Sequence, residues 1–370
     1  MTDYLRRIRP ATDSTSALGK EVEADLDESE GGIGWWNGHV GWKVSAQLGE
    51  YLISSCEGVE SSLRHASLAV EEHRRVEYSL NFDRLRRVRA LEGRASSRDE
   101  KIGALTGGSA SEKRREDMQA VWSEQILVSL AQALDRLAAV ALIVSGIKED
   151  VLRADWVSLM AIAKKEARGG PTQGLRQGVY ADLDSAGREH QHSFLATIAR
   201  SESHGPEDWL PWLLKARNTG VHRAPRMRVY TMVTDRGRIS GLILPLPAQP
   251  DWADTEAVVH TSRGGFESMF LQQAPQLIYE GLLASVVSLV AAVSEASREL
   301  WIERRANPEL IIQHGGTWRP MDKASIVRFH GYGEAAPTVT KEIALHPSII
   351  RRLRAAKLFG DQVDEWEAGS

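Results

Sequence analysis

The sequence predicts a mainly α-helical protein with an α+β C-terminal part. In its first half, apolar residues recur at helical spacing, and no proline occurs between Pro10 and Pro171. After Pro225, short β-rich runs alternate with turn signals, which is typical of strands and hairpins. The chain has 370 residues, of which 42% are apolar and 26% are charged. These values indicate a soluble globular protein of two or three domains, at roughly 100–200 residues per domain.

Residues 1–40 are predicted to be a flexible, disordered acidic tail. They contain eight acidic and four basic side chains, few large apolar ones, and glycines at positions 31, 32 and 34. Such a composition buries too little apolar surface to offset the entropy of ordering the chain. Trp35, Trp36 and Trp42 follow the acidic block and are expected to anchor the tail to the folded protein.

The next two segments are predicted to be helical. Residues 41–110 form an N-terminal helical extension, whose apolar face consists of Leu48, Leu52, Val59, Leu63 and Val70. We interpret its basic run, from Arg84 to Arg94, as a solvated face, with an RNA-binding surface as the alternative. Residues 111–225 form a bundle with helices at 112–147, 150–167, 184–200 and 206–221. In the last of these, Pro211 either kinks the helix or marks its true start.

Residues 226–370 are predicted to be an α+β domain. Two β-rich runs, 227–233 and 238–244, flank a Thr-Asp-Arg-Gly turn and indicate a hairpin. Further strand candidates lie at 257–261 and around Ile311 and Ile326. A long apolar helix is expected at about 273–304. The chain then ends with a basic helix that contains Arg351, Arg352, Arg354 and Lys357.

Several locations and chemistries are excluded by the residues present. The single cysteine, Cys56, cannot form an intramolecular disulfide and suits a reducing compartment. No secretory signal is visible, and the apolar stretches 126–147 and 282–293 fall short of the roughly 20 uninterrupted residues of a membrane span. We therefore expect a cytoplasmic protein. Phosphate-binding loops, nucleophile elbows and zinc-helix motifs are missing, and His190 and His192 point to different sides of a helix. No metal and no cofactor are expected.

One motif indicates chemistry. Arg217, Asn218 and His222 form an Arg-Asn-x3-His pattern near the end of the helix predicted at 206–221. The chain has four asparagines, so this pattern is expected by chance roughly 0.01 times, or about 0.1 times if Asp or His is allowed at the second position. As an alternative, Arg217 and His222 are simply cations at a helix C-terminus, where the helix dipole favours them, with Gly220 as the stop signal.

Placed late in the last helix of a helical bundle, this motif resembles that of the HEPN superfamily, many of whose members are metal-independent ribonucleases of toxin–antitoxin, phage-defence and RNA-processing systems. The resemblance covers residues 111–225. It implies that Arg217, Asn218 and His222 are the catalytic residues, that the active site is shared by two subunits of a homodimer, and that an antitoxin or defence-system protein is a possible partner. The extra helices before the bundle and about 145 residues after it depart from this family pattern.

The residue chemistry agrees with RNA cleavage. Histidine can act as acid or base near neutral pH, and a guanidinium can grip two phosphoryl oxygens. Asn218 and His222 are four residues apart and share a helix face. Arg217 lies roughly 140° from His222 around the helix, so the two side chains can meet only if the Arg217 side chain bends, if the helix unwinds at Gly220, or across a subunit interface. Because one histidine cannot be acid and base at once, a two-fold axis beside this helix end solves both problems.

The charge distribution also favours RNA as the partner. The net charge of −4 excludes a general nucleic-acid coat. Residues 211–230 nevertheless hold five basic and no acidic side chains: Lys215, Arg217, Arg223, Arg226 and Arg228. The sequence therefore predicts a cytoplasmic endoribonuclease that works by 2′-OH attack and leaves a 2′,3′-cyclic phosphate. The alternative is a non-catalytic HEPN-like module that binds RNA, nucleotide or a partner protein.

Overall fold

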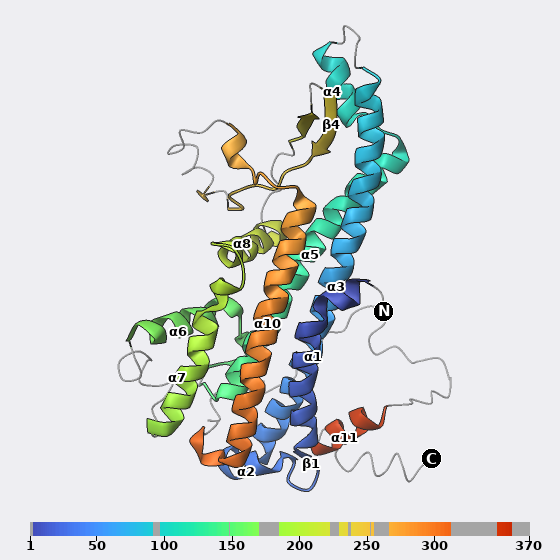
Figure 1. The fold of residues 1–370 in the computed structure, drawn as a ribbon. Coiled ribbons are helices and arrows are strands. Elements are labelled where there is room, and N and C mark those ends of the chain that lie inside the picture. The colour runs from blue at the N-terminus through green and yellow to red at the C-terminus, as the bar shows by residue number, and fades with distance from the viewer. Residues whose placement is uncertain are drawn as a thin grey trace, which may run out of the picture. The chain divides into compact units, whose positions relative to one another are not determined.

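The computed structural model of the chain is drawn in Figure 1 and describes residues 3–91, 97–147, 149–169, 185–222, 229–235, 238–251, 253–254, 266–311 and 346–356. Helices account for 81% of these residues, which confirms the mainly α prediction. The α-helices are α1 (Asp3–Ala24), α2 (Gly34–Val40), α3 (Trp42–Arg89), α4 (Arg98–Thr106), α5 (Ala110–Ser145), α6 (Trp156–Gly169), α7 (Ser185–Ala199), α8 (Trp209–His222), α10 (Pro275–Ala306) and α11 (Pro347–Ala355).

The remaining elements are short. Four 3₁₀ helices are described: η1 (Val151–Arg153), η2 (Ser201–His204), η3 (Phe266–Met269) and η4 (Pro308–Leu310). The described strands form two antiparallel pairs. In the first, β1 (Leu26–Asp27) pairs with β2 (Gly32–Ile33), and in the second β3 (Thr231–Asp235) pairs with β4 (Arg238–Ile243), with a bulge between Val233 and Thr234. The second pair confirms the predicted hairpin, although Thr234 and Asp235 belong to β3 rather than to the turn.

The chain divides into two compact units, each assembled from three segments. Unit 1 consists of Met1–Ser16, Glu57–Leu137 and Thr197–Glu295, and unit 2 of Ala17–Cys56, Ala138–Ala196 and Ala296–Ser370. Each unit contains residues from all four segments that were predicted as separate domains. The long helices α1, α3, α5 and α10 each contribute to both units.

Residues 3–24 form α1, so the prediction of a flexible, disordered tail is wrong. Ile8, Ala11, Thr15, Leu18 and Val22 are fully or almost fully buried. Their spacing of three to four residues is that of one face of a helix. Two of these side chains are small or polar, which hides the periodicity from a search for large apolar residues.

The acidic block forms part of the fold of unit 2. Glu21 pairs with Arg298 and Arg305 of α10, each at 3.2 Å. Asp25 pairs with Arg305 at 3.1 Å and accepts a hydrogen bond from Trp301 Nε1 at 2.8 Å. These pairs explain how a segment rich in acidic residues is held in place.

The tryptophans behave as the predicted anchor. Trp36 is fully buried, and its ring lies edge-on to that of Trp301 with centroids 5.4 Å apart. Trp35 makes a similar contact with Trp301 at 5.0 Å. Arg304 lies over Trp36, 5.0 Å from the ring centroid. The side chain of Trp42 falls outside the described part of the structure.

The helix predictions for residues 111–225 agree with α5, α6, α7 and α8 to within a few residues, except that η1 takes the place of the first turn expected at 150–167. The helical extension predicted at 41–110 consists of two helices, α3 and α4, and α3 ends at Arg89. Pro211 lies in the first turn of α8, so it marks a helix start rather than a kink. By length and composition, α5 and α10 could cross a membrane, but 72% and 56% of their most apolar windows are buried within the protein. Core helices of a soluble protein show the same burial.

The C-terminal predictions are met in part. The long helix α10 and the basic helix α11 are present, and Arg352 of α11 pairs with Glu50 at 2.8 Å. Arg352 is therefore a structural residue of unit 2. Ile311 is buried directly after η4 and belongs to no strand. The strand candidates at 257–261 and around Ile326 lie outside the described residues, as does Lys357.

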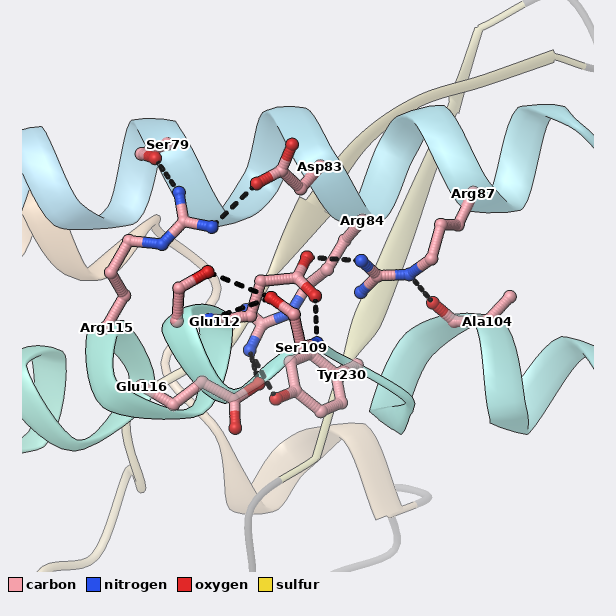
Figure 2. A network of polar contacts seen from close by, with 11 residues as sticks. Ser79, Asp83, Arg84, Arg87, Ala104, Ser109, Glu112, Arg115, Glu116 and Tyr230 are labelled. Atoms are coloured by element: carbon pink, nitrogen blue, oxygen red, sulfur yellow. Dashed lines mark hydrogen bonds and ion pairs between the residues drawn. The ribbon is translucent and has the colours of Figure 1, made fainter.

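The basic run at the end of α3 forms a polar network with α5, drawn in Figure 2. Arg84 is 2% exposed, pairs with Glu116 and donates to the Tyr230 hydroxyl at 3.0 Å. Arg87 pairs with Glu112, and Arg115 of α5 reaches back to Asp83 at 2.8 Å.

Both earlier interpretations of this run, a solvated face and an RNA-binding surface, are wrong for Arg84 and Arg87, because their guanidiniums are used to join α3 to α5. Arg86 and Arg89 are exposed, as a solvated face predicts. Arg94 lies outside the described residues.

Candidate functional site

Helix α8 carries the Arg-Asn-x3-His motif. Asp208 precedes the helix with a φ of 60°, a left-handed conformation that separates Pro206 from the helix and makes α8 begin at Trp209. The helix is fixed in unit 1 by the buried side chains of Leu210 and Leu213. Trp212 donates from Nε1 to the carbonyl of Pro247 at 3.3 Å. The motif is therefore built on a well-anchored helix.

Arg217 and Asn218 are brought together with a third residue from α5. Arg217 Nη2 donates to Asp135 Oδ2 at 2.6 Å, and Nη1 donates to Asn218 Oδ1 at 2.8 Å. The Arg217 and Asp135 side chains are 28% and 23% exposed, so the ion pair is reachable from solvent. Asp135 was not predicted as a site residue, because it is separated from the motif by 82 residues. The structure thus places an acceptor on each side of the guanidinium.

His222 is the last residue of α8, four positions after Asn218. The helix continues through Gly220, so unwinding at that glycine does not bring Arg217 towards His222, and Gly220 does not stop the helix. Around a regular helix the two positions remain about 140° apart. The side chain of His222 lies outside the described part of the structure, so its contacts stay a prediction.

The predicted basic patch is partly neutralised in the structure. Lys215 is exposed and pairs with Asp254 at 2.6 Å. Arg217 pairs with Asp135, as described above. A count of charges within residues 211–230 could not detect these carboxylates, because both come from distant segments. Arg223, Arg226 and Arg228 lie outside the described residues.

A buried polar cluster that the sequence did not reveal lies in the same unit. His73 Nδ1 is 3.2 Å from Gln276 Oε1 and 4.0 Å from Glu77 Oε2. The His73 ring is edge-on to Tyr279, with centroids 5.0 Å apart. The available signals were the i, i+4 pair His73 and Glu77 and the i, i+3 pair Gln276 and Tyr279, but neither is specific.

Burial changes the protonation of this cluster. It raises the pKa of Glu77 to about 7 and lowers the pKa of His73, where the hydrogen bond to Gln276 acts in the opposite direction. It also raises the pKa of Tyr279 to about 12, against an opposing contribution from Ser123. At neutral pH the tyrosine hydroxyl is therefore protonated, the imidazole is neutral, and the Glu77 carboxyl is close to its midpoint.

Replacing Glu77 with glutamine should remove a component of the pH dependence of stability. The folded-state pKa of about 7 exceeds the ordinary value of 4.5, so the native state holds a proton that the unfolded state loses between these values. The free energy of unfolding should therefore fall as the pH rises from 4.5 to 7, and the contribution of Glu77 to this fall should be about 3 kcal/mol. The check is a set of urea midpoints at pH 5, 6, 7 and 8 for both proteins.

The lowered pKa of His73 acts below pH 6.5, where the unfolded state binds the additional proton and stability falls with falling pH. That contribution is present in both proteins and largely cancels in the difference. Parallel stability profiles for the wild type and Glu77→Gln would show that Glu77 does not titrate as described.

The described residues contain no group of three or more His, Cys, Asp or Glu side chains arranged to hold a metal ion. His190 lies 2.9 Å from Glu303, and His192 lies 4.0 Å from the buried Glu166.

No family model, curated protein or solved structure matches the chain. The fold and the site define a mainly helical protein that presents a reachable Arg-Asn pair near the end of α8.

Proposed function

We propose that the protein is a metal-independent endoribonuclease of the toxin or phage-defence type, acting in the cytoplasm as a homodimer with a HEPN-like helical bundle. The observation that supports this most is the geometry of α8, where Asn218 and Asp135 hold the Arg217 guanidinium on the helix that ends five residues later at His222. A fixed cation and a histidine are the two groups that RNA cleavage without a metal requires.

Each residue has a defined role in this proposal. Arg217 uses two of its five N–H groups on Asn218 and Asp135, which leaves others for phosphoryl oxygens. His222 removes the proton from the ribose 2′-OH or protonates the departing 5′-oxygen. Asp135 is a positioning residue, because it acts on the substrate through Arg217.

A second copy of the chain completes the proposed site. The continuous helix keeps Arg217 and His222 on different sides of α8, and a single histidine cannot supply both acid and base. A two-fold axis beside the end of α8 would place one subunit's Arg217 beside the other's His222. Lys215, Arg223, Arg226 and Arg228 would then contact the RNA backbone.

The second candidate is a non-catalytic HEPN-like module that binds RNA, nucleotide or a partner protein such as an antitoxin. It is favoured by the ion pairs of Lys215 with Asp254 and of Arg217 with Asp135, which lower the positive charge available for catalysis.

Incubation of purified protein with RNA in EDTA separates the two functions. The nuclease should cleave RNA, leave a 2′,3′-cyclic phosphate and spare a substrate with a 2′-deoxy residue at the cleavage position. Failure to cleave any RNA, or equal cleavage of the 2′-deoxy substrate, would favour the second candidate.

A further inference from the structure

A cavity of about 450 Å³ lies in unit 1 beside the motif helix. Helix α8 contributes Trp212, Ala216, Thr219 and Gly220 to its wall, which also includes residues of α3, α5 and α10. Ala216 and Thr219 directly flank Arg217 and Asn218 in the sequence. The volume lies within the range of about 300–1,000 Å³ that small-molecule sites occupy.

One polar group in the cavity wall makes no hydrogen bond of ordinary length. Tyr279 is fully buried and lines the cavity, and its hydroxyl oxygen has no partner at hydrogen-bond distance among the described residues, although Ser123, also in the wall, lies close enough to lower its pKa. Buried polar groups are almost always hydrogen-bonded, because an unsatisfied one lowers stability. An acceptor atom of a ligand that reached this hydroxyl would satisfy it.

A neighbouring histidine adds an acceptor. Gln276 Nε2 donates to Glu280 Oε1 at 2.7 Å, which fixes the amide so that its oxygen faces His73. Nδ1 of His73 therefore carries the hydrogen, and Nε2 is the acceptor of the neutral ring. His73 and Tyr279 together offer one donor and one acceptor at the cavity wall.

The rest of the wall favours a flat, neutral ligand. Trp212 and Phe270 supply aromatic rings, and Pro245, Pro247 and Pro250 supply apolar surface. Among the described residues of the wall there is no lysine or arginine but one acidic residue, Glu124, so a phosphate has no counter-charge inside the cavity. Lys215 and Arg217, on either side of Ala216 in α8, are the nearest cations along that helix.

We propose that this cavity binds a nucleobase, either of a free nucleoside or of an unstacked residue of RNA. Aromatic rings stack on the faces of a base, and Tyr279 and His73 pair with its edge. The phosphates remain outside, towards the cations of α8. The RNA source of the base rests on the proposed function, whereas the binding of a base by the cavity does not.

The test is the binding of the four ribonucleosides, measured by isothermal titration calorimetry, to the wild type and to Tyr279→Phe. The variant removes one oxygen atom and keeps the ring. At least one nucleoside should bind saturably to the wild type, and its affinity should fall about tenfold in the variant. The matched control is Tyr78→Phe on α3. Tyr78 is 76% exposed, so this variant should bind the nucleoside like the wild type.

Thermal unfolding without ligand gives a second measurement on the same proteins. Because the Tyr279 hydroxyl is buried and makes no hydrogen bond of ordinary length, Tyr279→Phe should unfold at the same temperature as the wild type or at a higher one. A lower unfolding temperature would show that the hydroxyl has a structural partner and would overturn the proposal. So would the absence of nucleoside binding, or equal binding by Tyr279→Phe and Tyr78→Phe.

Two further results identify the source of the base and separate the two proposals. Competition between the bound nucleoside and a short 2′-O-methyl oligonucleotide, which cannot undergo 2′-OH attack, would indicate RNA. Lack of competition would indicate the free nucleoside. If the protein never cleaves RNA but binds nucleosides, and Tyr279→Phe weakens that binding, the nuclease proposal fails and the cavity proposal stands.

Discussion

Replacement of Arg217 with alanine is expected to slow RNA cleavage by a factor of about 10²–10³ without unfolding the protein, because it removes the cation that stabilises the negative charge on the phosphoryl oxygens in the transition state. The ion pair with Asp135 is partly exposed on both sides, so its loss should cost no more than about 1 kcal/mol of stability. His222→Ala should have an effect of about 10²–10⁴ on the rate, as expected for a general acid or base.

The measurement is single-turnover cleavage of a defined RNA in EDTA, together with thermal unfolding of each variant. Arg75→Ala is the matched control, because Arg75 is also ion-paired but is 63% exposed on α3 and belongs to no proposed site. If Arg217→Ala and Arg75→Ala cleave RNA at the same rate, Arg217 has no part in the reaction. Asp135→Asn should have an intermediate effect, since it loosens Arg217 without removing its charge.

The largest expected loss of stability follows replacement of Arg304 in unit 2. Arg304 is fully buried and donates to the carbonyls of Ile143 and Ile311, each at 3.0 Å, and to that of Val144. Ile143 and Val144 lie in the final turn of α5, where carbonyls lack partners within the helix. Burial lowers the pKa of Arg304 to about 9, so it stays charged at neutral pH.

Arg304→Ala should therefore lower the free energy of unfolding by about 4 kcal/mol, through lost charged hydrogen bonds and an unfilled space beside Trp36. Arg305→Ala is the control, because its ion pairs with Glu21 and Asp25 are 35% exposed on the arginine side and should contribute about 1 kcal/mol or less. Urea midpoints followed by circular dichroism report both. Equal shifts for the two variants would contradict the role given to Arg304.

The parts of the fold that were predictable from sequence are those with long, apolar periodic patterns. Helices α3, α5 and α10 carry large apolar residues over many turns, so their existence could be predicted, and for α5 and α10 their approximate ends as well. Helix α1 was missed because Ala11 and Thr15 occupy its buried face and the acidic residues that follow suggest disorder. Glu21, in this segment, pairs with Arg298 and Arg305, which lie 277 and 284 positions further along the chain. A search of local patterns cannot detect such pairs.

The same limit applies to the candidate site. Arg217, Asn218 and His222 could be predicted because they are close in sequence and the pattern is rare. Asp135 and the cavity beside α8 could not, since each depends on which segments meet in the folded chain. Local charge counting also overestimated the basic patch, because Asp254 comes from beyond the counted residues.

The three-segment construction of each unit has a consequence for synthesis on the ribosome. Unit 1 includes Thr197–Glu295, and unit 2 includes residues after Ala296, so neither unit holds all its segments until most of the chain has been made. Contacts between such distant segments form slowly, because long loops must close first. A nascent chain that stops before Glu295 would therefore expose the apolar faces of α3 and α5, and it would be a substrate for chaperones rather than an active fragment.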